Sequence, residues 1–121
     1  MSDQVAIKNC VDQYYQSLCT SDADGIRSVF HPTARIAGYL PDGLHEMTRE
    51  DFAEFVQSQQ PSPAESGAEP MLDILSIEVA GHTAAVRLRE SYLGMVFLDN
   101  FGMLQVDGHW LIYNKLFHVE G

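Results

Sequence analysis

Apolar side chains in the first part of the chain recur with the period of a helix. Over residues 4–20 they fall three or four positions apart, which predicts a helix with one buried stripe. The stripe consists of Ile7, Val11, Tyr14 and Leu18. A second, short helix is expected over about 23–30, because Ser21 or Asp22 can cap its start and Pro32 stops it.

A short strand and a third helix are expected next. Ala34–Tyr39 is strand-like, and Pro41-Asp42-Gly43 supplies the residue types that a tight turn requires. Thr48 is the predicted N-cap of the third helix, because Asp51 three residues later gives a near match to a capping box. The apolar side of this helix consists of Phe52, Phe55 and Val56.

The second half of the chain alternates between strand-like runs and turns. Residues 59–70 contain three prolines and no aromatic residue, which predicts a loop, or alternatively a flap over a cavity. Asp107-Gly108 is a strong signal for a two-residue hairpin turn, because both positions need a positive φ. Since helices precede an antiparallel meander, the pattern predicts an α+β fold. The expected strands are Met71–Ala80, Thr83–Tyr92, Met95–Val106 and His109–His118.

The hairpin turn determines which side chains of the last two strands share a face. A two-residue turn pairs Val106 with His109, which places Asp99 opposite Leu116; a bulge or a three-residue turn would reverse this pairing. The face expected to meet the helices carries Met95, Phe97, Asp99, Phe101, Met103, Trp110, Ile112, Asn114, Leu116 and His118. The opposite face carries Val96, Leu98, Asn100, Gly102, Leu104, Leu111, Tyr113, Lys115 and Phe117. Because this second face is also apolar, it predicts a homodimer that forms through the outer face of the sheet.

The composition fits one soluble domain spanning residues 1–121. The formal net charge of −10 repels polyanions, so neither nucleic acid nor an anionic membrane surface is an expected partner. No apolar run approaches the roughly 18 residues of a membrane span. Cys10 and Cys19 are about 13 Å apart along one helix, whereas a disulfide needs Cα atoms within about 7 Å. Free thiols, together with the lack of a signal-peptide pattern, predict a cytoplasmic protein.

Polar side chains interrupt the apolar rows at a few positions, and these are the candidates for chemistry. Asp99 stands between Phe97 and Phe101, where desolvation favours a neutral carboxyl that can donate a hydrogen bond to an oxyanion. Tyr14, from the helical stripe, can supply a second donor. His118, on the same predicted face, can act as an acid or base near neutral pH. The structural alternatives are a buried Asp99 bound to a backbone group or to His118, and a His118 at the rim.

Other polar residues predict little. Glu90 lies near the end of a predicted strand, and we interpret it as a residue that reaches solvent. The five histidines lack the close pairing of metal ligands, and the chain has no Gly-rich phosphate loop. Neither a metal ion nor an organic cofactor is therefore expected.

Six short segments together resemble the nuclear-transport-factor-2-like (NTF2-like) superfamily, also called SnoaL-like, and within it the branch labelled "putative lumazine-binding". They are Phe30–Arg35, Asp42-Gly43, Arg49–Phe52, Ile74–Val79, Asp107–Trp110 and Asn114–His118. The resemblance implies a cystatin-like conical half-barrel of the α+β class, in which three N-terminal helices pack on a curved, mostly antiparallel sheet. Such proteins are commonly dimeric through the outer face of the sheet. The superfamily includes isomerases, dehydratases, cyclases and binding modules, so the fold does not give the function.

One pair of residues resembles a known site within the superfamily. Tyr14 and Asp99 match the oxyanion pair of ketosteroid isomerases. The position of their general base is Gly38 here, and Asp42 lies four residues later in a turn. Proton abstraction therefore lacks its base.

The sequence favours a protein that binds a small molecule in an apolar pocket suited to a ring-containing ligand. Tyr14, Asp99 and His118 would orient the ligand. The remaining pocket walls are predicted to be Phe52, Val56, Phe97, Phe101, Trp110 and Asn114. The alternatives are an isomerase or dehydratase of carbonyl compounds, in which His118 moves the proton, and a structural dimer with a filled cavity.

Overall fold

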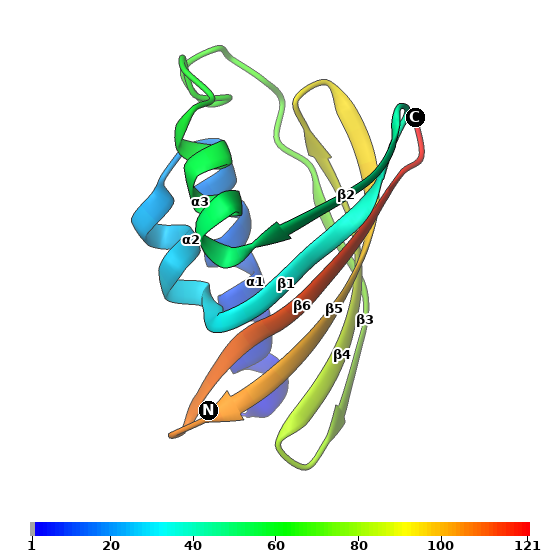
Figure 1. The fold of residues 1–121 in the computed structure, drawn as a ribbon. Helices are drawn as coiled ribbons and strands as arrows, with labels where there is room; N and C mark the ends of the chain where they lie inside the picture. Colours follow the sequence, from blue (N-terminus) through cyan, green and yellow to red (C-terminus); the bar gives the residue numbers. More distant parts are fainter. Residues whose placement is uncertain (1) are drawn as a thin grey trace.

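The computed structural model describes residues 2–121, and it confirms the α+β class (Figure 1). Three helices come from the first half of the chain, and four of the six strands come from the second half. The helices are α1 (Asp3–Cys19), α2 (Ala23–Val29) and α3 (Arg49–Gln57). The strands are β1 (Phe30–Leu40), β2 (Gly43–Thr48), β3 (Leu72–Ala80), β4 (Thr83–Tyr92), β5 (Met95–Val106) and β6 (His109–Val119).

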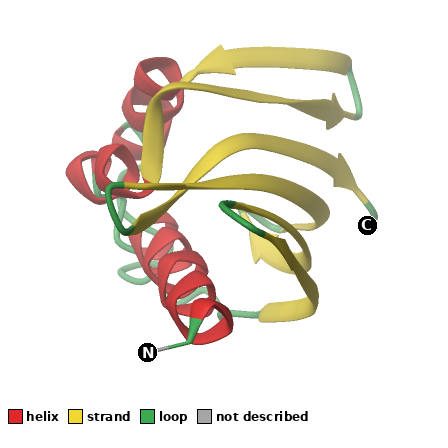
Figure 2. Ribbon diagram, turned by 90° about the horizontal axis from the view of Figure 1, so that it is seen from below, coloured by secondary structure: helices red, strands yellow, loops and turns green. Residues whose placement is uncertain are grey.

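The six strands form one curved sheet in the order β2-β1-β6-β5-β4-β3. All neighbouring pairs are antiparallel except β1 and β6, which are parallel. Figure 2 shows the helices on one side of the curved sheet, which is the arrangement of a conical half-barrel. The hydrophobic core fills the space between the helices and this concave face.

Local sequence signals explain most helix boundaries. The Thr48 side chain accepts a hydrogen bond from the backbone N–H of Asp51, whose carboxylate accepts one in return, so the predicted capping box is present. The strand after α2 begins earlier than predicted, at Phe30, because its start pairs with β6. The edge strand β2 was not predicted, because none of its residues is fully buried and the apolar residues of Gly43–Thr48 do not alternate with polar ones, although half-buried and exposed positions do alternate.

The predicted turn at the end of β5 is confirmed, but the predicted facing of β6 is wrong beyond its first residues. Asp107 and Gly108 have φ values of 51° and 79°, and Val106 pairs with His109. A bulge then shifts the register, because Met103 pairs with Ile112 while Gly102 pairs with Asn114. The extra residue, Tyr113, reverses the alternation of side chains that follows it.

Because of this bulge, two sets of β6 side chains lie on the opposite faces of the sheet from those predicted. Asn114, Leu116 and His118, which were predicted to face the helices, are exposed on the outer face. Lys115 and Phe117, which were predicted to face outward, are buried on the concave face. The structure thus places a lysine inside the half-barrel.

The long loop between α3 and β3 arches over one end of the molecule (Figure 1). Hydrogen bonds hold it against the end of α1 and the residues that follow: the Ser21 hydroxyl donates to the carbonyl oxygen of Gln59 (2.6 Å), and the Ala64 N–H donates to that of Cys19 (2.9 Å). The loop therefore covers the end of the half-barrel at which α1 ends. Among residues 2–121, no helix is both long and apolar enough to cross a membrane.

Candidate functional site

A chain of three polar side chains runs through the core. The Nζ of Lys115 donates to the hydroxyl oxygen of Tyr14 (2.7 Å), and this hydroxyl donates to a carboxylate oxygen of Glu90 (2.8 Å). Their exposed fractions are 6%, 0% and 1%. The three residues come from β6, α1 and β4, so the hydrogen bonds join the helical layer to two strands of the sheet.

Asp99 lies beside this chain without a donor of its own. It is fully buried, and neither of its carboxylate oxygens accepts a hydrogen bond from the described residues. Burial raises the pKa of Asp99 well above its usual range, the nearby carboxylate of Glu90 raises it further, and Lys115 opposes both. When protonated, Asp99 can donate a hydrogen bond to the carboxylate of Glu90.

The protonation of Asp99 balances the charge of the cluster. With Asp99 neutral, the ammonium of Lys115 compensates the carboxylate of Glu90, and no net charge is buried. The same environment raises the pKa of Tyr14 well above its usual value, first through burial and then through Glu90, so its hydroxyl stays protonated. The cluster can therefore hold or move one proton, at Asp99.

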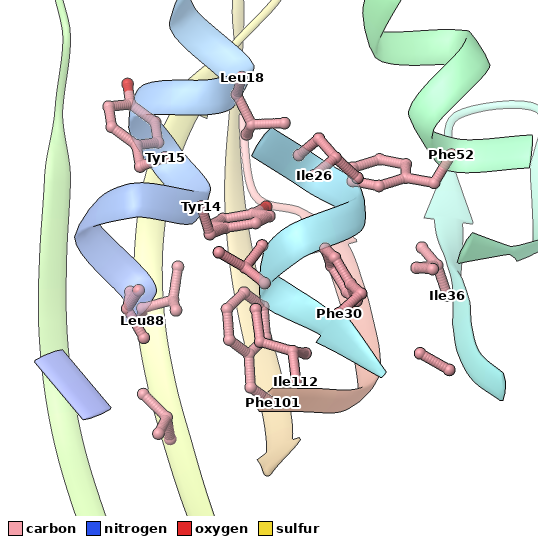
Figure 3. Close-up of a cluster of buried hydrophobic side chains, with 14 of the residues drawn as sticks. Tyr14, Tyr15, Leu18, Ile26, Phe30, Ile36, Phe52, Leu88, Phe101 and Ile112 are labelled. Carbon is pink, nitrogen blue, oxygen red and sulfur yellow. The ribbon is translucent and has the colours of Figure 1, made fainter. Parts of the chain in front are cut away.

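Aromatic rings surround the polar cluster. The ammonium of Lys115 lies 4.6 Å from the ring centroid of Phe52, 5.1 Å from that of Tyr14 and 5.5 Å from that of Phe117. These distances are typical of cation–π contacts. The Phe101 ring meets Tyr14 edge to face at 5.0 Å, and Figure 3 shows Tyr14 projecting from α1 toward Phe101 and Phe30.

The predicted pocket walls are well-packed core residues. Phe52, Val56, Phe97, Phe101 and Trp110 are buried, with exposed fractions of 8% or less. Trp110 donates to a carboxylate oxygen of Asp3 (3.3 Å) and borders an open groove near the N-terminal half of α1. Asn114 lies on the outer face, where its side-chain oxygen accepts the N–H of Gly102 (2.9 Å).

The isomerase-like arrangement is not assembled. Tyr14 donates its proton to Glu90, and His118 is exposed on the outer face, where it pairs with Leu98. At Gly38, a Cβ atom would lie 2.2 Å from the carbonyl oxygen of Phe117, so the fold leaves no room for a carboxyl at the position of the general base. Asp42 is exposed and bonded to His45 (2.8 Å).

A cavity of about 450 Å³ opens at the covered end of the half-barrel. It lies between the C-terminal end of α1, the loop after α3 and the turn between β4 and β5. The lining is rich in rings and small apolar groups, and includes Tyr15, Cys19, Pro63, Ala68, Tyr92 and Leu93. The loop therefore forms one wall of a cavity, as in the flap alternative.

Tyr92 separates this cavity from the polar cluster. Its side chain borders the cavity, yet its hydroxyl is shielded from solvent and has no hydrogen-bond partner among the described residues. Burial raises the pKa of Tyr92, and the charge of Glu90 raises it further. The two residues lie two positions apart on the buried face of β4. The cavity and the buried acids are thus neighbours across one ring.

The two thiols are free, and burial favours their protonated form. Neither Cys10 nor Cys19 forms a disulfide, as predicted. Burial raises the pKa of the Cys10 thiol to about 12, and it also raises the pKa of Cys19. Both are therefore protonated at neutral pH, which makes them poor nucleophiles.

Sequence reasoning missed two members of the polar cluster. Glu90 was interpreted as reaching solvent, but it is buried on the same face as Leu88 and Tyr92. The signal in the sequence was the alternation that places Glu90 on the same face of the strand as Leu88 and Tyr92. Lys115 was assigned to the outer face because the bulge at Tyr113 was not anticipated.

Comparison with known proteins gives a family and several similar folds. A family model described as "Putative lumazine-binding" matches residues 2–118. An NTF2-like protein of unknown function from Silicibacter pomeroyi DSS-3 has a TM-score of 0.86 at 21% identity, over 99% of this chain and 100% of that one. One from Methylobacillus flagellatus KT has a TM-score of 0.86 at 26% identity, over 98% and 93%.

A third similar structure is described as having a cystatin-like fold. It is a domain of unknown function with a cystatin-like fold from Nostoc punctiforme PCC 73102, with a TM-score of 0.72 at 17% identity, over 98% of this chain and 78% of that one. No curated protein matches the chain. These structures have no stated activity, so they establish the fold alone.

Proposed function

Because the chain belongs to the NTF2-like family described as "Putative lumazine-binding", we propose that it binds a small ring-containing molecule in the cavity under the loop after α3. The observation that carries the proposal is the cavity itself. Its volume of about 450 Å³ lies within the roughly 300–1,000 Å³ of small-molecule sites. The family description names lumazine, a flat ring system; for this chain we propose the class of ring-containing ligands rather than that compound.

The lining favours a flat ligand over a flexible one. Tyr15 and Tyr92 both contribute rings to the lining of the cavity, one from α1 and one from β4. Tyr15 is held in place because its hydroxyl donates to the carbonyl oxygen of Ser91 (2.7 Å) and accepts the N–H of Met71 (3.0 Å). A preordered aromatic wall reduces the entropy that binding would otherwise cost.

The neutral naphthalene dye prodan tests this proposal, because its emission shifts to shorter wavelength when it enters an apolar site. Wild-type protein is expected to bind prodan with a saturable blue shift. Ala68→Trp, which places a large ring in the cavity, should abolish the shift. Ala80→Trp is the matched control, since Ala80 is exposed at the end of β3 and does not line the cavity.

Two outcomes contradict the proposal. One is the absence of saturable prodan binding by the wild-type protein. The other is an Ala68→Trp variant that remains folded by circular dichroism and binds prodan as tightly as the Ala80→Trp control.

A further inference from the structure

We propose that the buried acids Asp99 and Glu90 form a recognition subsite for a cationic nitrogen on the ring-containing ligand, such as an amidinium or an ammonium group. This inference rests on the proposed function, because the ligand would reach the subsite from the cavity under the loop. It adds a ligand class to that function: a ring with a positively charged, hydrogen-bond-donating edge.

The first argument is that, among the described residues, no backbone, hydroxyl or ammonium group donates a hydrogen bond to Asp99. Buried carboxyls in folded proteins nearly always have a hydrogen-bond partner, and each exception needs an explanation. The hydrogen bonds of the cluster run from Lys115 to Tyr14 and from Tyr14 to Glu90, and none of them ends on Asp99. Once its proton is released, the carboxylate of Asp99 offers two acceptor oxygens, which match the two parallel N–H groups of an amidinium.

The second argument is that this interior already holds a cation. The ammonium of Lys115 is kept there by one hydroxyl oxygen and by three rings, those of Tyr14, Phe52 and Phe117. The same environment extends to Asp99, which pairs across the sheet with Phe117 on one side and lies in the row of Phe97 and Phe101. Aromatic walls and a carboxylate together suit an organic cation better than an anion.

The third argument is charge balance. With Asp99 protonated, Lys115 and Glu90 compensate each other. A bound cation would deprotonate Asp99, and the site would then hold two positive and two negative charges. The titratable groups that face Asp99 are Tyr14 from α1, Glu90 from β4 and Lys115 from β6.

The route into the subsite passes Tyr92. On β4 the inward-facing residues run from Tyr92 through Glu90 to Leu88, and Leu88 pairs with Asp99 on β5. A ligand in the cavity therefore meets the ring of Tyr92 first, then Glu90, then Asp99. No group of the described residues bonds to the Tyr92 hydroxyl, and Tyr92 directly precedes the turn at Leu93-Gly94. Its side chain is therefore the one that must move aside.

Benzamidine and benzamide test the inference, because they share size and shape and differ in charge. Titration by isothermal calorimetry should give at least about tenfold tighter binding of benzamidine to the wild-type protein. Asp99→Asn should remove this preference. Asp73→Asn, at an exposed carboxylate on β3, is the matched control and should retain it.

A second measurement needs no variant. Because benzamidine binding would release the proton of Asp99, its affinity should rise by up to about tenfold per pH unit below the pKa of that group. In addition, the calorimetric enthalpy should differ between buffers of different ionisation enthalpy by the amount expected for one released proton. Benzamide binding should show neither effect.

Equal affinities for the two probes, or benzamidine binding without proton release, would overturn the inference. So would a preference that survives in Asp99→Asn, since the net charge of −10 could attract benzamidine to the surface. Prodan binding by the wild-type protein separates the two proposals. If prodan binds and benzamidine shows no preference, the cavity remains the proposed site and the cationic ligand class is wrong.

Discussion

The hydroxyl of Tyr14 is hydrogen-bonded to the carboxylate of Glu90 at 2.8 Å, deep in the core, although the two residues are 76 positions apart in the chain. This contact determines how the buried polar groups are hydrogen-bonded. It engages the proton of Tyr14, anchors α1 to β4 and leaves Asp99 as the acid whose proton can be exchanged. The consequences for stability can be measured directly.

Removal of the Tyr14 hydroxyl should destabilise the protein strongly. In Tyr14→Phe, Glu90 loses its donor and Lys115 loses its acceptor, while the ring packing is preserved. Leaving buried charged groups unsatisfied costs about 2–3 kcal/mol or more. The free energy of unfolding, from urea titration, should fall by that amount. Tyr39→Phe, at a residue that is 55% exposed, should change it by less than about 0.5 kcal/mol.

The interaction between Lys115 and Glu90 through Tyr14 should appear in a double-mutant cycle. Lys115→Met leaves the buried Glu90 carboxylate without a compensating cation. Removing one partner of a buried charge pair typically lowers the free energy of unfolding by about 3–5 kcal/mol. Adding Glu90→Gln removes that uncompensated charge, so the double variant should be more stable than the sum of the single effects predicts, by about 1–3 kcal/mol. Additive effects would show that the two residues are not coupled.

The helices and the final turn could be predicted because their signals are local. The stripe that contains Tyr14, the cap at Thr48 and the Asp107-Gly108 turn each depend on a few neighbouring residues. The burial of Asp99 was also predictable from its apolar flanks. All of these features follow from side-chain period and turn chemistry.

The partners of Asp99 could not be predicted, because they depend on which residues of β6 point toward the helices. Successive side chains of a strand point to opposite faces, so one extra residue reverses this assignment. One extra residue at Tyr113 moves Lys115 inward and His118 outward, and no residue of β6 itself signals the bulge. A weak signal was available across the hairpin. Gly102 lies in a strand interior, where glycine often marks a bulge or a close approach; here a Cβ would lie 2.8 Å from the side chain of Asn114.

The raised pKa of Asp99 predicts how stability depends on pH. The unfolded chain loses the proton of this carboxyl near pH 4, whereas the folded protein retains it to higher pH. Between these two pKa values the folded state binds more protons, so Asp99 lowers stability as the pH rises, by up to about 1.4 kcal/mol per unit. Asp99→Asn removes this dependence.

Urea titrations of the wild type and Asp99→Asn from pH 4 to pH 8 check the prediction. The stability of the variant relative to the wild type should increase steadily with pH and then level off above the pKa of folded Asp99. A difference that stays constant over this range would mean that the carboxyl titrates normally in the folded protein.

The outer face of the sheet should be the contact between two copies of the chain. Leu116 and Tyr113 are 53% and 39% exposed there, and Tyr39 is 55% exposed on the adjacent β1. A central apolar surface of this kind is typical of an isologous dimer interface. Leu116 pairs with Ala37 and Asn100 in the middle of the sheet. In such a dimer, a charged residue at this position would be buried in the interface from each of the two subunits.

Analytical ultracentrifugation should therefore find the wild type as a dimer and Leu116→Glu as a monomer at the same concentration. Val5→Glu is the matched control, since Val5 is 48% exposed on α1, away from the sheet's outer face, and its substitution should leave the dimer intact. A wild-type protein that sediments as a monomer would exclude this interface. Because Asp99 and the cavity lie on the other side of the sheet, the Leu116→Glu monomer should still bind prodan.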